Sequence, residues 1–106
     1  DMGAVCAYLE EHSGEPVSLD QLGEVAGLSK YYLLRSFTKQ KGISPYRYLE
    51  TIRIAKARKL LERNVPMIEV ALQTGFADQS HFSRFFKRLI GVTPRQYAEI
   101  FGGRQA

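Results

Sequence analysis

The chain contains one cysteine, no tryptophan and only four prolines among its 106 residues. Because Cys6 has no second cysteine to pair with, no internal disulfide can form, and this usage fits a reducing cytoplasm. No apolar run approaches the roughly 18 residues of a membrane span, and the start lacks a charged-then-apolar signal pattern. We therefore expect a soluble, cytoplasmic protein without a metal, a cofactor or a membrane segment. The absence of an initiator methionine before Asp1 predicts a piece of a longer chain.

Basic residues are absent from the first 29 positions, which hold six acidic residues. All fifteen Lys and Arg residues lie in 30–106, where only five acidic residues accompany them, a local balance of +10. A charge run is usually only a solvated face. Where it coincides with a recognition motif, however, it predicts that this part of the molecule faces a polyanion.

Strand patterns are also scarce, because no segment alternates apolar and polar residues for long. Instead the chain nearly repeats itself at an offset of 48 or 49 residues. Gly23, Gly27, Leu33, Arg35, Phe37, Gly42, Pro45 and Tyr48 correspond to Ala71, Gly75, Phe82, Arg84, Phe86, Gly91, Pro94 and Tyr97. The offset rises between Gly75 and Asp78, which predicts a longer turn in the second copy. Each copy has the pattern of a helix-turn-helix, so the chain is expected to place two reading helices on one DNA duplex.

We expect an all-α fold of seven helices, over about 2–12, 18–27, 29–41, 45–63, 66–74, 78–90 and from 93 onward. Capping boxes at Ser18 and Thr93, and N-caps at Ser29, Ser44 and Asp78, set the starts. The expected organisation is a first helix-turn-helix subdomain (1–43), a linker helix (44–64) and a second subdomain (65–106). The linker helix of about 19 residues spans roughly 28 Å, which is close to one turn of B-DNA, about 34 Å. The two recognition helices could therefore enter successive major grooves. The tail from Gly102 is expected to fray.

Small residues mark the turn of each copy. Gly27 and Gly75 are expected to end the first helix of each unit with a positive φ. Gly23 and Ala71 lie one turn earlier, where a larger side chain would keep two helices from crossing closely. We interpret all four as features of the fold and not as DNA contacts.

The helix over 78–90 has an apolar stripe of Phe82, Phe86 and Leu89. The opposite face carries Gln79, Ser80, Ser83, Arg84 and Lys87. Gln and Arg form bidentate hydrogen bonds with adenine and guanine, and the first two turns of the second helix of the motif reach base edges. We therefore predict base contacts by Gln79, Ser80, Ser83 and Arg84.

In the repeat, the helix over 29–41 corresponds to the helix over 78–90. This correspondence predicts an outward-facing set of Lys30, Tyr31, Leu34, Arg35 and Thr38. Leu34 takes the place that Ser83 has in the other copy. Two interpretations stay open: Leu34 is buried elsewhere, or it contacts a thymine methyl group. In the second case Arg35 supplies most of the polar readout, and Tyr31 and Leu34 supply shape.

Phosphate contacts are expected from basic side chains and from the starts of helices. The candidates are Lys30, Thr38, Lys39, Lys41, Ser44, Lys56, Lys87, Thr93 and Arg95.

These residues resemble the DNA-binding domain of the AraC family of bacterial transcription regulators over nearly the whole chain. The stretch from Val70 to Lys87, followed by Gly91-Val92-Thr93-Pro94, looks like the family signature, and Val25 to Pro45 also resembles its pattern. The resemblance implies seven helices in two lobes, with base-reading positions at Tyr31, Leu34, Arg35, Gln79, Ser80, Ser83 and Arg84. It further implies a longer protein, commonly an activator, with an effector-binding or dimerisation domain and RNA polymerase as a partner. Leu34 departs from the polar residues often found at its position.

Three other functions fit less well. An enzyme would need several catalytic side chains close together. His12 and His81, however, are far apart in the helical pattern, and Cys6 lies on an apolar helix face. An RNA binder is disfavoured because a helix suits the major groove of B-DNA and not that of A-form RNA. A helical protein-interaction module with degenerate DNA binding is the main alternative.

Overall fold

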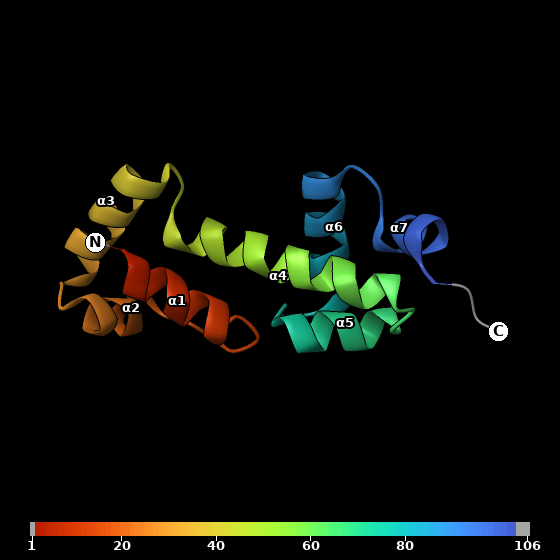
Figure 1. Ribbon diagram of the computed structural model, residues 1–106, viewed down its shortest axis with the longest axis horizontal. Coiled ribbons are helices and arrows are strands. Elements are labelled where there is room, and N and C mark those ends of the chain that lie inside the picture. Colours follow the sequence, from red (N-terminus) through yellow and green to blue (C-terminus); the bar gives the residue numbers. More distant parts are fainter. Residues whose placement is uncertain (1, 104–106) are drawn as a thin grey trace. The chain divides into compact units, whose positions relative to one another are not determined.

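A computed structural model describes residues 2–103, and the described part contains seven α-helices and no strand. In chain order they are α1 (Gly3–Glu11), α2 (Leu19–Ala26), α3 (Lys30–Lys41), α4 (Pro45–Glu62), α5 (Met67–Thr74), α6 (Gln79–Ile90) and α7 (Pro94–Phe101) (Figure 1). The predicted all-α fold is confirmed, and the predicted helix limits agree to within one or two residues. None of the described helices is both long and apolar enough to cross a membrane.

Side-chain caps explain where several of these helices begin. Ser18 Oγ accepts a hydrogen bond from the Gln21 backbone N–H at 3.2 Å, and Gln21 Oε1 accepts one from the Ser18 N–H at 2.8 Å. Thr93 and Gln96 repeat this capping box at 3.1 and 2.9 Å. Both arrangements satisfy amides that a helix start leaves without intrahelical partners. The two predicted capping boxes are therefore confirmed.

The turn of each helix-turn-helix begins at a left-handed glycine. Gly27 ends α2 with φ of +70°, and Gly75 ends α5 with φ of +89°. A side chain disfavours this conformation, so glycine is needed at both positions. Ser29 then caps α3, whereas Asp78 caps α6. The second turn is one residue longer, as the change of offset predicted.

The chain divides into two compact units, one up to Ile52 and one from Arg53, with the boundary inside α4. Within the first unit α2 and α3 form the helix-turn-helix, and within the second α5 and α6 do so. Each unit contains a further duplicated element that the sequence did not reveal. Three residues at the start of the chain and three in α4 share the same spacing and are all buried: Met2, Val5 and Leu9, and Ile54, Ala57 and Leu61. The second half of α4 therefore takes in the second unit the place that α1 takes in the first.

Each unit has its own apolar core. In the first, the fully buried Leu33 and Phe37 of α3 pack with residues of α1, α2 and α4, and Phe37 meets Tyr48 edge-on at 5.4 Å between ring centroids. In the second, Phe82 and Phe86 of α6 are the counterparts, and Phe86 meets Tyr97 edge-on at 5.5 Å. The same aromatic pair therefore fixes the recognition helix of each unit against its next helix.

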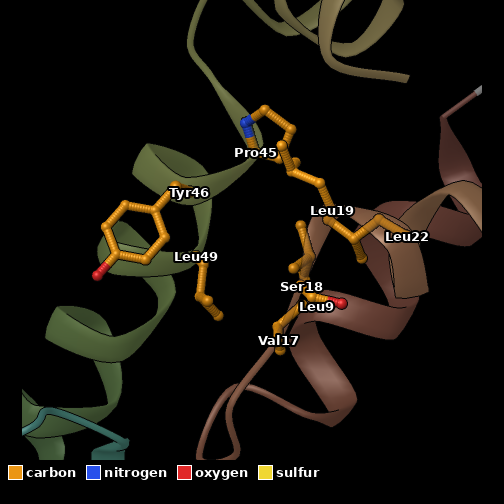
Figure 2. A pocket seen from close by; sticks show the side chains of 8 residues that line it. All are labelled: Leu9, Val17, Ser18, Leu19, Leu22, Pro45, Tyr46 and Leu49. Carbon is orange, nitrogen blue, oxygen red and sulfur yellow. The ribbon is translucent and has the colours of Figure 1, made fainter. Parts of the chain in front are cut away.

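A small apolar pocket lies within the first unit, between the start of α4 and the α1–α2 region (Figure 2). Its walls are Leu9, Val17, Ser18, Leu19, Leu22, Pro45, Tyr46 and Leu49. Buried members of the core, Leu9, Leu22 and Leu49, supply part of its lining. The pocket is thus a packing defect of the first core, and none of the predicted DNA-contacting residues lines it.

Two expectations were wrong in detail, and one on Gly23 is supported. Leu89 does not join the stripe of α6, because its side chain is 45% exposed and Phe85 is buried in its place. A methyl group at Gly23 would meet the Leu28 carbonyl oxygen at 2.5 Å and the backbone nitrogen of Lys30, the first residue of α3, at 3.6 Å, so the small residue allows the turn and the start of α3 to lie close to α2, as expected. The tail does not fray at Gly103, whose N–H donates to the Glu62 carbonyl at 2.8 Å. The rest of the predicted frayed tail, residues 104–106, lies outside the described residues.

Candidate nucleic-acid interface

The outer face of α6 is polar, as predicted. Gln79, Ser80, Arg84 and Lys87 are exposed and Ser83 is partly exposed. The opposite face is anchored by the fully buried Phe82 and Phe86. Because these two rings prevent the helix from rotating about its axis, the side chains of its outer face point to solvent in a fixed register.

The start of α6 is held by its cap. Asp78 Oδ1 accepts a hydrogen bond from the His81 backbone N–H at 2.7 Å. The ring of His81 meets the ring of Phe76 edge-on, with centroids 5.5 Å apart. His81 therefore packs against the preceding turn through its ring, and the capped first turn of α6 supports Gln79 and Ser80.

The outer face of α3 carries its predicted residues on one side of the helix. Tyr31, Leu34, Arg35, Thr38 and Lys39 line a single open hollow. Lys30 lies next to them, with its Nζ 5.7 Å from the centroid of the Tyr31 ring. The predicted readers and neighbouring phosphate candidates of the first unit therefore share one face.

The two faces are equivalent position by position at an offset of 49 residues. Arg35 and Arg84 correspond, and both are exposed. The other corresponding pairs are Lys30 and Gln79, Tyr31 and Ser80, Leu34 and Ser83, and Thr38 and Lys87. Lys39 corresponds to Arg88, an exposed cation that the sequence analysis did not select, although the offset alone would have indicated it.

Four of the remaining phosphate candidates lie at helix ends. Lys41 ends α3 and is exposed. Ser44 Oγ accepts a hydrogen bond from the Arg47 N–H at 3.1 Å, so this side chain also caps α4. In the capping box of α7, the backbone N–H and the Oγ of Thr93 are both hydrogen-bonded to Gln96. Residue 94 is a proline without an N–H, so the next backbone N–H belongs to the exposed Arg95. A phosphate at this helix start would therefore be bound by Arg95, because the Thr93 amide already has a partner.

Lys56 belongs to the second unit and does not lie on α6. It lines a hollow between α4 and α5 with Lys59, Leu60, Arg63, Gln73 and Thr74, and no residue of α6 contributes to that hollow. Lys59 and Arg63 are basic residues that the sequence analysis did not select. Their spacing from Lys56, three and seven residues along the chain, is the signal that predicts all three on one side of a helix, although α4 itself ends at Glu62, just before Arg63.

Comparison with known proteins shows the family. A family model described as a helix-turn-helix domain matches residues 22–100. The chain is 40% identical over 101 residues to the "HTH-type transcriptional activator RhaS" of Escherichia fergusonii, covering 94% of this chain and 35% of that protein. A solved AraC-type DNA-binding-domain regulator from Chromobacterium violaceum superposes with a TM-score of 0.88 at 26% identity, over 98% of this chain and 94% of the other.

The chain belongs to the AraC family of helix-turn-helix domains. It is also 64% identical over 77 residues to the uncharacterized regulator YbfI of Bacillus subtilis, covering 73% of this chain and 28% of YbfI. The DNA-binding domain of AdpA, solved with a target DNA, has a TM-score of 0.85 and 30% identity over 92% of this chain and 88% of that one. This AraC-type domain thus spans about a third of the length of the two curated relatives. It is a DNA-binding domain of the kind that transcription regulators carry, and its family is not one of enzymes.

Proposed function

We propose that this AraC-type domain binds duplex DNA of defined sequence, with α3 and α6 as recognition helices in successive major grooves. One observation carries the proposal: the outer faces of α3 and α6 repeat in register, and each presents an exposed arginine at the same position, Arg35 and Arg84. Arginine forms bidentate hydrogen bonds with guanine O6 and N7. A duplicated unit with a reader at the same place in both copies suits a binding site of two short blocks.

The assignment of single residues is part of this proposal. Gln79 and Arg84 supply bidentate donors to bases in the second block, and Ser80 and Ser83 make shorter polar contacts. Arg35 reads a base in the first block, with Tyr31 and Leu34 beside it. Phosphates are contacted by the set Lys30, Thr38, Lys39, Lys41, Ser44, Lys56, Lys87, Thr93 and Arg95.

We further propose that the domain belongs to a longer bacterial regulator that activates transcription. The name of the relative RhaS supports the activating role, and the share of RhaS that the chain spans supports a further domain for an effector or for dimerisation. RNA polymerase is the partner that activation requires. Because bacterial DNA lies in the cytoplasm, the proposed protein acts there.

Selection of bound sequences from a random duplex library at about 150 mM salt tests the proposal. We expect two short enriched blocks about 10 base pairs apart, the spacing of one helical turn. Arg84→Ala is expected to remove preference in one block and Arg35→Ala in the other. Arg47→Ala, on α4 and outside both recognition faces, serves as the matched control and retains both blocks. Absence of any enriched sequence contradicts the proposal and favours the protein-interaction module.

A further inference from the structure

Leu34 is an apolar side chain on the outer face of a recognition helix. Its side chain is 38% exposed, whereas its neighbour Leu33 is completely buried in the core of the first unit. Leu34 is not among the residues that build or pack against that core. The interpretation that Leu34 is buried elsewhere is therefore wrong, and its apolar surface needs another explanation.

The surroundings of Leu34 form a small apolar platform with a polar border. Tyr31 lies one turn before it on the same face, with 74% of its side chain exposed. Both line the open hollow of α3, which Arg35, Thr38 and Lys39 complete. Tyr31 and Leu34 can thus cover an apolar group of a ligand. The guanidinium of Arg35, the hydroxyl of Thr38 and the ammonium group of Lys39 lie in the same hollow.

The duplication provides an internal comparison for this platform. At the corresponding positions of α6 stand Ser80 and Ser83, whereas the arginine is kept as Arg35 and Arg84. The fold therefore accepts small polar side chains at these two outer positions. Packing does not require Tyr31 and Leu34. The difference in side chains between α3 and α6 therefore reflects a difference in the ligand groups that the two outer faces contact.

We propose that Leu34, flanked by Tyr31, recognises the C5-methyl group of a thymine in the first block of the binding site. This inference rests on the proposed function and deepens it. The methyl group of thymine is the one apolar feature that a base pair presents in the major groove, and apolar side chains contact it there. Since Arg35 follows Leu34 directly, the thymine and the base that Arg35 reads lie close together in that block. The second unit, with Ser83 and Ser80, does not read a methyl group.

Modified DNA tests this assignment without changing the protein. In the selected binding site each thymine of both strands is replaced in turn by deoxyuridine, which lacks only the C5-methyl group. Removing one buried methyl group is expected to weaken binding by about four-fold. We expect this loss at a thymine of the block that Arg35→Ala affects, and no loss of that size at any thymine of the block that Arg84→Ala affects.

Leu34→Ser supplies the matched variant, because it installs the residue that α6 has at this place. It is expected to bind the thymine and deoxyuridine duplexes with equal affinity, while Arg47→Ala, outside both recognition faces, leaves the four-fold difference intact. Leu34→Gln, which keeps a strong helix former, repeats the test if the serine variant does not fold. Circular dichroism of each variant checks that α3 is retained.

The outcomes separate this inference from the proposed function. If the selected site is bound but no thymine of the first block responds to deoxyuridine, the assignment of Leu34 is overturned and sequence-specific binding stands. A four-fold loss that persists in Leu34→Ser also overturns the assignment. If no sequence is enriched at all, the proposed function itself has failed, before any modified duplex is made.

Discussion

Arg58 and Tyr97 join α4 to α7 within the second unit. The Arg58 Nε–H donates a hydrogen bond to the Tyr97 hydroxyl oxygen at 3.2 Å, and the guanidinium carbon lies 5.7 Å from the centroid of the ring. The Tyr97 hydroxyl in turn donates to Glu62 Oε2. The hydrogen bond with Tyr97 raises the pKa of Arg58 above its ordinary value. One tyrosine hydroxyl thus connects a cation and a carboxylate of α4 with the helix that follows the recognition helix.

Tyr97→Phe is expected to lower the free energy of unfolding by about 1.5 to 3 kcal/mol. The substitution keeps the ring against Phe86 but removes the hydroxyl that two charged side chains share, and the ring is only 4% exposed. A net loss of this size is typical of hydrogen bonds to charged groups. Urea denaturation measures it. Tyr46→Phe is the control, since Tyr46 is 53% exposed and its change should stay within about 0.5 kcal/mol. Equal losses in both variants would contradict the role of the Tyr97 hydroxyl.

Tyr48, the corresponding tyrosine of the first unit, is expected to make the stability of the fold depend on pH above about pH 10. Hydrogen bonding with the Cys6 side chain is the main cause that raises the pKa of Tyr48, with burial and nearby Glu10 adding to it. A raised pKa in the folded state means that stability is fully present below about pH 10 and is lost as pH rises through the folded value, because the unfolded chain releases its proton first. Unfolding free energies between about pH 9 and 12 should fall less in Tyr48→Phe than in the wild type. Tyr32→Phe, 64% exposed, should follow the wild type.

Helix limits were predictable from sequence because each is set by a local signal. Ser18, Asp78 and Thr93 cap helices through hydrogen bonds to residues three positions away, and Gly27 and Gly75 end them by their own backbone conformation. Such interactions depend on neighbours in sequence, so they can be identified without a fold. The outer faces of α3 and α6 were predictable for the same reason, since a helical period sorts inner from outer residues.

Interactions across the fold were not predictable in this way. The correspondence between α1 and the second half of α4 is hidden, because the connection from α4 to α5 is shorter than that from α1 to α2. The helical period also assigned Leu89 to the core, although Phe85 lies there. Arg88, Lys59 and Arg63 were not selected because a single cation on a helix surface does not differ from a solubilising one; only the repeat offset for Arg88, and the spacing from Lys56 for the other two, distinguishes them.

Gly23→Ala is expected to destabilise the first unit. The new methyl group would lie 2.5 Å from the carbonyl oxygen of Leu28, which belongs to the turn and cannot rotate away like a side chain. Forcing such a contact costs about 1 to 3 kcal/mol. Thermal unfolding measures the loss. Ala71→Gly, at the corresponding position of the second unit, is the reverse change, and its cost should be only about 1 kcal/mol, the helix propensity of glycine. A neutral Gly23→Ala would show that the turn relaxes.

Asp78→Ala is expected to loosen the first turn of α6 and to weaken preference for the second block. Its Oδ1 holds the His81 N–H, and loss of an N-cap costs about 1 kcal/mol. Asp78→Asn keeps a capping oxygen but removes the same negative charge. Both variants therefore share any general gain in affinity from losing a charge near phosphates. Only Asp78→Ala should lose selectivity in a competition between the selected duplex and random duplex; equal selectivity of the two variants would contradict the role of the cap.

Arg84→Ala and Lys87→Ala separate base reading from phosphate contact on one helix. Both side chains are exposed on α6, less than one turn apart. Arg84→Ala is expected to cost about 1 to 3 kcal/mol on the selected duplex and little on random duplex, because a bidentate contact to a base is lost. Lys87→Ala should weaken binding to both duplexes alike.

Salt dependence provides a second readout of the same pair. If the domain neutralises about eight phosphates, a plot of log affinity against log salt should have a slope near −7. Lys87→Ala should make that slope shallower by about 0.9, the contribution of one phosphate contact, whereas Arg84→Ala should leave it nearly unchanged. Because the slope counts neutralised phosphates and not base contacts, it distinguishes the two roles even where both variants lose similar affinity. Equal losses of Arg84→Ala on selected and random duplex, together with a shallower slope, would move Arg84 from the base-reading set to the phosphate set.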